Sequence, residues 1–329
     1  MGFFRKRDKK EVTRIFFATD IHGSEKCFRK FINAGKFYGA DILVLGGDLT
    51  GKSIVPIVEQ KNGVYTCMFM GQERIVKTQA DVQKLEDIIK FSGCYPYRTD
   101  SDTMEKIAGD KSKVDQLFTE LMIKTLQDWI KLAEERLMNT GIKMYVTGGN
   151  DDSFAIDSVI KNSKYVIDPE SDVVRLNETY EMLSSGWSNP TPWKTPRECN
   201  EDELFEKLEK LTSKVENMNS CIFNLHAPPK GTDLGTCVEL DASVYPPKPI
   251  MEGGSPKLFD AGSMAVRKLI EKHQPMLGLH GHIHESSGVA KIGRTVCINP
   301  GSEYGEGILR GVIVDLDDKG IRSYQLTSG

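Results

Sequence analysis

The sequence predicts an α/β fold organised around a parallel β-sheet. Two apolar runs, residues 14–19 and 41–45, are dense in bulky side chains and too short to form helices. Between them lie four apolar residues at near-helical spacing, Phe28, Phe31, Ile32 and Phe37. A strand, a helix and a second strand in this order form a βαβ unit, whose two strands run parallel.

The same alternation of elements resumes later in the chain. Short strand-like runs occur at residues 143–147, 165–167, 173–176, 181–184, 220–225, 276–279, 295–298, 311–316 and 321–326. Helices are predicted at about 201–218, where Asn200 begins a capping-box pattern, and at about 263–273. We therefore expect a single domain over residues 1–329, with a long Pro/Gly-rich loop at 227–262.

A long excursion at residues 51–142 separates the first two predicted strands from the third. Runs at 54–59 and 64–70 flank Asn62-Gly63, a dipeptide that is typical of a two-residue hairpin turn. One helix follows this hairpin, and a longer helix is predicted at about 111–139. The excursion is interpreted as an insertion in the domain or a cap over its site.

Composition and charge limit the classes of function. The 329-residue chain has a net charge of -4, which gives no basis for general affinity to nucleic-acid phosphates. The basic segment at residues 1–10 lacks the apolar core of a signal peptide, and no run approaches the roughly 18 apolar residues of a membrane span. Seven cysteines without a CxxC pair indicate free thiols, so we expect a cytoplasmic protein with no membrane partner.

Side chains that bind metals follow five of the predicted strands, at the point where each strand ends. They are Asp20 and His22 after 14–19, Asp48 after 41–45, Asn150 after 143–147, His226 after 220–225, and His280, His282 and His284 after 276–279. The carboxyl ends of parallel strands meet at one edge of a sheet, so these side chains are expected to lie together. Of the six histidines, His273 alone lies outside these segments.

Taken singly, each segment also has an ordinary structural interpretation. Gly47-Asp48 and Gly149-Asn150 are common kinds of turn, and one histidine after a strand is more often a hydrogen-bonded structural residue than a ligand. Their joint occurrence favours a metal site. Mixed oxygen and nitrogen ligands suit Mn, Fe, Zn, Co or Ni, and two such ions roughly 3.5–4 Å apart can activate a shared water and clamp a phosphoryl oxygen.

The motifs, in their order along the chain, resemble those of the calcineurin-like metallophosphoesterase superfamily. They are D-x-H at 20–22, G-D at 47–48, G-N-D at 149–151, a histidine at 226 and G-H-x-H at 281–284. The turn Asn299-Pro300-Gly301-Ser302 is similar to one found late in that family. The excursions at 51–142 and 227–262 resemble a prokaryotic branch of predicted phosphoesterases related to the Icc-type cyclic-nucleotide phosphodiesterases.

This resemblance implies a four-layer α/β/β/α sandwich of two mixed sheets, with a helical and hairpin insertion and two divalent transition-metal ions at one edge. By motif, one ion would be held by Asp20, His22, Asp48 and His284. The other would be held by Asp48, Asn150, His226 and His282, so that Asp48 bridges the two ions. His280 matches no ligand position and is expected to orient a ligand or to contact phosphate.

Asp151 departs from the family pattern, because many members have a histidine there that acts near the leaving group. An aspartate can serve as a general acid only if burial or negative charge raises its pKa, and two nearby cations would keep it ionised. Alternatively the leaving group departs unaided, which favours substrates with acidic leaving groups.

Three functions stay open from the sequence. The first is a phosphoesterase in which a hydroxide activated by two metal ions attacks a small phosphate ester, with phosphodiesters preferred. The second is a catalytically weak metal-binding scaffold for protein assembly, and the third is a nuclease, for which no basic stripe interleaved with aromatics is evident. A homo-oligomer also stays open. Selectivity is expected to come from loops at roughly 50–53, 93–103, 186–200 and 227–262.

Overall fold

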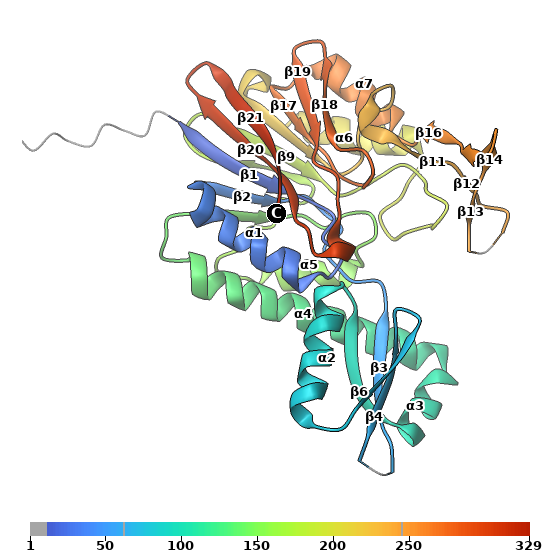
Figure 1. Ribbon diagram of the computed structural model, residues 1–329. Helices are drawn as coiled ribbons and strands as arrows, with labels where there is room; N and C mark the ends of the chain where they lie inside the picture. Colours follow the sequence, from blue (N-terminus) through green and yellow to red (C-terminus); the bar gives the residue numbers. More distant parts are fainter. Residues whose placement is uncertain (1–11, 62, 245) are drawn as a thin grey trace, which may run out of the picture.

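The protein is a mixed α/β structure, as the sequence predicts (Figure 1). The computed structural model describes residues 12–61, 63–244 and 246–329. The basic segment at 1–10 and Asn62 of the predicted hairpin lie outside the described residues. Two mixed sheets form the main body, and a smaller sheet forms a separate lobe beside it.

The first sheet is built on the predicted βαβ unit. Its strands, in spatial order, are β21 (Gly320–Ser328), β20 (Arg310–Asp317), β1 (Thr13–Ala18), β2 (Ile42–Leu45) and β7 (Lys143–Val146). β1, β2 and β7 run parallel, whereas β20 and β21 add to the other side of β1 in antiparallel fashion. Because side chains alternate along a strand, Phe16 of β1 faces the outer helices and Phe17 faces the second sheet.

The second sheet carries the remaining large strands. In spatial order they are β18 (Gly288–Ile292), β19 (Thr295–Asn299), β17 (Leu277–Leu279), β10 (Cys221–Leu225), β9 (Glu181–Ser185) and β8 (Asp172–Arg175). The four inner strands are parallel, and β18 and β8 pair antiparallel at the two edges. The predicted strand at 165–167 is wrong, because Ile167 makes only an isolated bridge with Tyr145 before the chain turns toward β8.

Helices cover the outer face of each sheet. α1 (Glu25–Tyr38) and α4 (Lys111–Leu137) pack on the first sheet, where the rings of Phe28 and Trp129 stack at 4.5 Å between centroids. α6 (Glu201–Thr212) and α7 (Met264–His273) pack on the second sheet, and short α5 (Asp157–Lys161) follows β7. A third apolar cluster fills the space between the two sheets.

The predicted helix at 201–218 begins where expected but ends early. The side chain of Asn200 caps it by accepting from the N–H of Glu203 at 2.9 Å. The helix stops at Thr212, because the backbone N–H groups of Glu216 and Asn217 turn away to donate to the buried carboxylate of Glu181. This turn delivers the chain to β10, the strand that precedes His226.

Residues 54–108 form a separate unit, which we call the lobe. Its sheet contains β5 (Gln72–Val76), β4 (Tyr65–Phe69), β3 (Ile54–Glu59) and β6 (Tyr95–Asp100), and its helices are α2 (Gln79–Phe91) and α3 (Ser101–Ala108). The hairpin between β3 and β4 forms at Gly63 as predicted, and an apolar cluster between α2 and the sheet gives the lobe its own core. Figure 1 shows the lobe projecting from the main body, and α4 leads the chain from the lobe back to the main body.

Residues 236–260, predicted as part of a loop, form a projecting unit of short strands that we call the arm. Its antiparallel pairs are β11 (Thr236–Val238) with β16 (Leu258–Asp260), β12 (Leu240–Asp241) with β13 (Lys248–Pro249), and β14 (Met251–Glu252) with β15 (Ser255–Pro256). These pairs span two or three residues each, too few for hydrophobic alternation to reveal them in the sequence. The prediction of a long unpaired loop is therefore wrong for this segment.

Two further findings concern the cysteines and the helices. All seven cysteines are free thiols, as predicted. Burial raises the pKa of Cys221 and of Cys297 to about 12, so these thiols stay protonated. Within the described ranges, no helix combines the length and the apolar character needed to cross a membrane.

Two phenylalanines of α1 provide a matched test of the packing. Phe28→Ala is expected to lower the free energy of unfolding by about 3–5 kcal/mol, because it removes a fully buried ring from the Trp129 stack. Phe37, placed by the sequence on the same apolar face, is 80% exposed, so Phe37→Ala is expected to change that free energy by less than about 0.5 kcal/mol. Urea unfolding of both variants measures the difference, and equal losses would contradict the described packing of α1.

Candidate metal centre

The predicted ligand residues lie together, on loops that leave the carboxyl ends of five strands. β1 leads to Asp20 and His22, β2 to Asp48, and β7 to Asn150. In the second sheet, β10 leads to His226, and β17 leads to His282 and His284. The two sheets present these loops at one edge because all five strands approach it with their carboxyl ends. Most of these side chains are buried, and only His282 and His284 are partly exposed.

Four of these residues have a backbone in the left-handed region. The φ angle is 53° at Asp20, 38° at His22, 50° at Asp48 and 69° at His282. Such conformations cost about 1–3 kcal/mol for residues other than glycine, so the surrounding structure must hold them. It does so through backbone bonds from the Asp20 N–H to the Gly47 carbonyl and from the His22 N–H to the Asp48 carbonyl, both 2.9 Å long.

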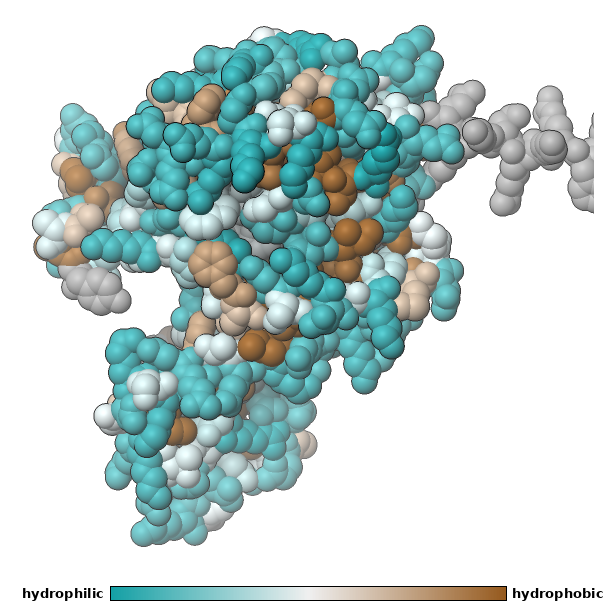
Figure 2. Space-filling model, turned by 180° about the vertical axis from the view of Figure 1, so that it is seen from behind, coloured by the Kyte–Doolittle hydropathy of each residue, from teal (hydrophilic) through white to brown (hydrophobic). Residues whose placement is uncertain are grey.

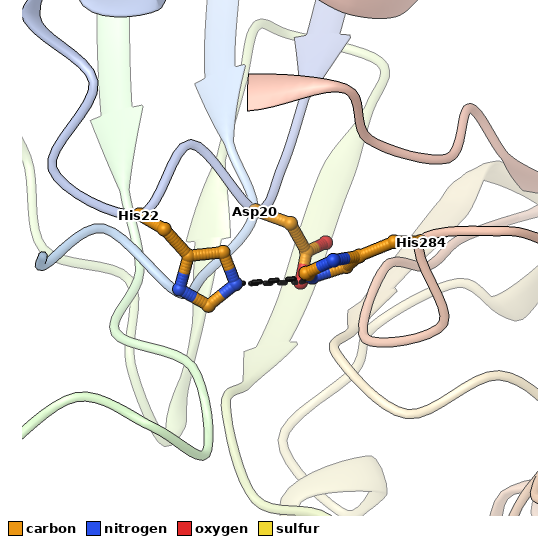
Figure 3. Close-up of side chains that lie close together, drawn as sticks. All are labelled: Asp20, His22 and His284. Carbon is orange, nitrogen blue, oxygen red and sulfur yellow. Dashed lines mark hydrogen bonds and ion pairs between the residues drawn. The ribbon is translucent and has the colours of Figure 1, made fainter. Parts of the chain in front are cut away.

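Asp20, His22 and His284 form a first group of ligand atoms (Figure 3). The Nε2 atoms of the two histidines lie 3.0 Å apart, and His284 Nε2 lies 3.3 Å from Asp20 Oδ1. Figure 3 shows the three side chains pointing toward one another, Asp20 and His22 from the loop after β1 and His284 from a separate loop. All their ligand atoms lie within 4.8 Å of one another, so one cation can contact the three.

Asp48, His226 and His282 form a second group. His226 Nε2 lies 3.4 Å from Asp48 Oδ1, while its Nδ1 faces the Gly46 carbonyl at 3.1 Å. The Nδ1 atom therefore carries a proton and Nε2 faces the group. Asp48 Oδ2 also lies 3.6 Å from His22 Nε2, so this carboxylate reaches both groups.

Four buried polar atoms at or beside the site have no hydrogen-bond partner among the described residues: His22 Nδ1, Asn150 Oδ1, His226 Nε2 and His280 Nε2. The amide nitrogen of Asn150 donates to Thr195 Oγ1 at 2.8 Å, which identifies the oxygen as the unpaired atom. Leaving such an atom buried and unpaired costs about 1–3 kcal/mol. Divalent cations accept oxygen and imidazole ligands together, so these residues fit the predicted ions.

Burial and neighbouring charges displace the pKa values of these groups. Burial acts to lower the pKa of His226, but the carboxylates of Asp48 and Asp20 outweigh it and raise that pKa to about 10. Burial also opposes ionisation of the two aspartates, yet nearby imidazoles hold both pKa values below the usual range. Burial lowers the pKa of His282 to about 4 and that of His22 to about 3. The aspartates are thus ionised, as ligands must be.

Asp152 supports the site from behind. Its carboxylate accepts from the backbone N–H groups of Leu49, Thr50 and Gly149 and from the Thr50 hydroxyl, at 2.7–3.1 Å. These bonds tie the loop that carries Asp48 to the loop that carries Asn150. Burial and the charge of Asp48 raise the pKa of Asp152 to about 6, against the effect of these bonds.

His280 is placed behind the second group rather than in it. Its ring is fully buried, and Nδ1 donates to the carbonyls of Leu225 and Ala227 at 2.8 and 3.1 Å. These carbonyls flank His226, so His280 holds the segment that presents this ligand. Asn299 similarly donates to the Gly281 and Ile283 carbonyls, which flank His282.

Lys52 and Tyr304 lie beside the site. The sequence singled out neither residue, although Lys52 falls within the predicted selectivity loop at 50–53. Lys52 Nζ pairs with Asp151 Oδ2 at 3.1 Å, and the ring centroids of Tyr304 and His22 lie 4.7 Å apart. Burial and Asp48 raise the pKa of Asp151, and Lys52 opposes this effect. Lysine after a glycine and tyrosine in a turn form no local motif, so only the fold brings them to the site.

A cavity of about 640 Å³ opens on these residues. The ligand-type side chains at its floor are His22, Asp48, Asn150, Asp151, His282 and His284. Its walls come from residues 189–195 and from the arm, and Figure 2 shows the surface hollowed between the arm and the lobe. Of the four predicted selectivity loops, those at 50–53, 186–200 and 227–262 contribute described residues to the lining, whereas 93–103 contributes none.

Comparison with other proteins identifies a relative and a common fold. No family model matches the chain. The uncharacterised protein MJ1162 of Methanocaldococcus jannaschii is 30% identical over 172 residues, which cover 52% of this chain and 67% of that protein. A sequence match of this extent indicates common descent.

Solved structures share the fold at low sequence identity. One crystal structure has a TM-score of 0.56 at 14% identity and covers 96% of this chain and 98% of its own. The crystal structure of TT1561 of Thermus thermophilus has a TM-score of 0.50 at 13% identity, and the match covers 97% of this chain and 98% of that one. The chain therefore belongs to one family with MJ1162, and it shares the fold of these solved structures.

Proposed function

We propose that the chain is a phosphoesterase that uses two divalent transition-metal ions. One ion would be held by Asp20, His22, Asp48 and His284, and the other by Asp48, Asn150, His226 and His282. The observation that carries this proposal is the presence of two adjacent ligand groups with Asp48 within reach of both. The unpaired atoms of Asn150 and His226 support it further, because both would gain a partner.

Such ions, when bound, lower the pKa of a water molecule and neutralise charge on phosphoryl oxygens. Mn, Fe, Zn, Ni and Co all suit this set of oxygen and nitrogen ligands. The elements stack in the order α1 with α4, the first sheet, the second sheet, and α6 with α7. This order supports the four-layer α/β/β/α arrangement in which this chemistry is expected. A small phosphate ester is the proposed substrate, with phosphodiesters preferred.

In this proposal Asp151 positions Lys52 instead of donating a proton itself. The ammonium group of Lys52 lies 3.1 Å from the Asp151 carboxylate, and both side chains line the cavity beside His22. A lysine ammonium binds phosphoryl oxygens as a point charge with three donors. Lys52 would therefore bind the substrate phosphate. Phosphodiesters with acidic leaving groups are preferred because they need little protonation on departure.

We further propose that the domain spans 1–329 and that the lobe is an extra layer within it. Among the described residues, none from 54–108 lines the cavity, which argues against a cap. The lobe lies directly beneath the site loop, since the Ser24 hydroxyl donates to the Phe91 carbonyl at 2.7 Å. A metal-binding assembly scaffold would use the same ligand atoms, so hydrolysis is the property that separates the two functions.

Hydrolysis of bis(p-nitrophenyl) phosphate tests the proposed function. The chain loaded with Mn²⁺ is expected to release p-nitrophenolate, EDTA to stop the release, and added Mn²⁺ to restore it. Asp48→Asn is expected to lower kcat on the order of 100-fold or more, because it weakens both ligand groups. Asp172→Asn, a surface aspartate paired with Lys214, is expected to stay within about twofold. Inactivity with Mn, Ni, Co and Fe each loaded would contradict the proposal and favour the scaffold.

Substitution of Lys52 tests its assignment to the substrate phosphate. Lys52→Ala is expected to raise KM for the same diester about tenfold with a smaller change in kcat, because the lost contact serves binding. Lys52→Arg is expected to recover most of the loss, since it keeps the charge. Metal content, measured by mass spectrometry, should not change in either variant. A loss of metal with an unchanged KM would instead make Lys52 a purely structural residue.

A further inference from the structure

The lining of the cavity at the metal centre combines side chains of two different chemistries. Charged and imidazole side chains form its floor, as described above. The apolar part of its lining, called the apolar wall below, consists of Pro190, Pro192, Trp193, Val238, Leu240 and Phe259. A phosphoryl group at the floor fills only a small part of about 640 Å³. The rest of the space suits an organic group with apolar surface.

Two aromatic side chains of this wall are incompletely covered. Trp193 is 56% exposed and Phe259 is 38% exposed. Among the described aromatic contacts, neither ring packs against another ring or lies beneath a cation. By contrast, Trp187 lies beneath the ammonium group of Lys207, and Phe205 beneath that of Lys272. Large rings left open inside a cavity provide stacking surface for a ligand.

The loop that carries Trp193 is held at a defined place relative to the metal centre. The carboxylate of Glu198 accepts from the N–H groups of Thr191 and Thr195 at 3.0 and 2.9 Å and from both of their hydroxyls. Thr195 Oγ1 in turn accepts from the Asn150 amide, and the Arg197 N–H donates to the Asn150 carbonyl at 3.1 Å. The aromatic wall is thus bonded to a proposed ligand.

The loop is also bonded to the base of the arm, which carries Phe259. The amide of Asn189 donates to the Ala261 carbonyl at 3.1 Å. Two acidic side chains in this part of the cavity lining are already engaged: Glu201 accepts from the first turn of α7, and Asp260 accepts from the Gly231 and Gly262 N–H groups. Hydrogen bonds therefore hold the loop and the base of the arm together, and Lys230 and Glu285 also lie in the cavity lining.

We infer that the substrate carries a flat aromatic group, such as an aryl ring or a nucleobase, that binds between Trp193 and Phe259 while its phosphate lies at the metal centre. This inference deepens the proposed function and rests on it. Rigid aromatic and proline walls favour a rigid flat group over a flexible chain, because neither partner loses much conformational freedom on binding. Lys52 at the floor supplies the positive charge that the phosphate end requires.

Phosphonates test the inference without hydrolysis. Methyl-, cyclohexyl-, phenyl- and naphthylphosphonate share one headgroup, and they differ only in the group that would reach the apolar wall. Calorimetry on the Mn²⁺-loaded chain is expected to give phenyl- and naphthylphosphonate dissociation constants at least about tenfold below that of methylphosphonate. Cyclohexylphosphonate, which is apolar but not flat, is expected to bind more weakly than phenylphosphonate.

Variants assign the preference to the two rings. Trp193→Ala and Phe259→Ala are each expected to reduce the ratio of methyl to phenyl dissociation constants several-fold, and the double variant to bring it near one. Phe37→Ala, which removes an exposed ring outside the cavity, is the matched control and should leave the ratio unchanged. Equal binding of all four phosphonates, equal binding of the cyclohexyl and phenyl compounds, or an unchanged ratio in the double variant would each overturn the inference.

The same preparations separate this inference from the proposed function. Hydrolysis of bis(p-nitrophenyl) phosphate reports on the function alone, and the phosphonate ratio reports on the aromatic group alone. Hydrolysis without an aryl preference would leave the phosphoesterase in place and overturn the aromatic substrate. An aryl preference without hydrolysis would support the aromatic site and contradict the phosphoesterase.

Discussion

The burial of Asp20 and Asp48 beside a set of imidazoles is the constraint on which the rest of the structure depends. Two carboxylates within a few ångströms repel each other in a medium of low polarity, and burial without a partner is costly. The surrounding imidazoles hold both groups ionised, yet Asn150 Oδ1 and His226 Nε2 stay unpaired. Divalent cations would offset the repulsion between the carboxylates and would also supply the partners that these two atoms lack.

The fold places this costly cluster at one edge and stabilises it from all sides. Apolar clusters between the sheets and beneath the outer helices fix the strands whose ends carry the ligands. Beyond those ends, Asp152 joins the loops of Asp48 and Asn150, while His280 and Asn299 hold the segments around His226 and His282. The strained backbone at four ligand positions is tolerated because these hydrogen bonds leave little room to relax.

The backbone must also approach the ligands closely at two glycines. A Cβ atom at Gly149 would lie 2.2 Å from Asp48 Oδ1, and one at Gly281 would lie 2.3 Å from Asp20 Oδ2. Any side chain at either position would displace a carboxylate of the cluster. The lack of room for a Cβ atom therefore explains the glycines of the G-N-D and G-H-x-H motifs.

The placement of the metal-type residues was predictable because it depends on local pattern. Apolar runs mark the strands, and a ligand that follows each run needs no knowledge of distant contacts. Lys52 and Tyr304 were not predictable, since neither forms a motif and both reach the site only through tertiary packing. The arm and strands β5 and β6 were missed for related reasons: the arm's ladders are very short, and Gln72–Val76 is mostly polar and exposed.

The chemistry and the selectivity of the site thus come from different parts of the chain. Strand ends provide the proposed ligands, whereas the Trp193 loop and the arm enclose the space where the organic part of a substrate would lie. The most direct test of this account is the anomalous diffraction of crystals of the Mn²⁺-loaded chain. The account expects two peaks on either side of the Asp48 carboxylate, both weakened by Asp48→Ala. A single peak, or peaks that contact neither Asp48 nor His226, would contradict it.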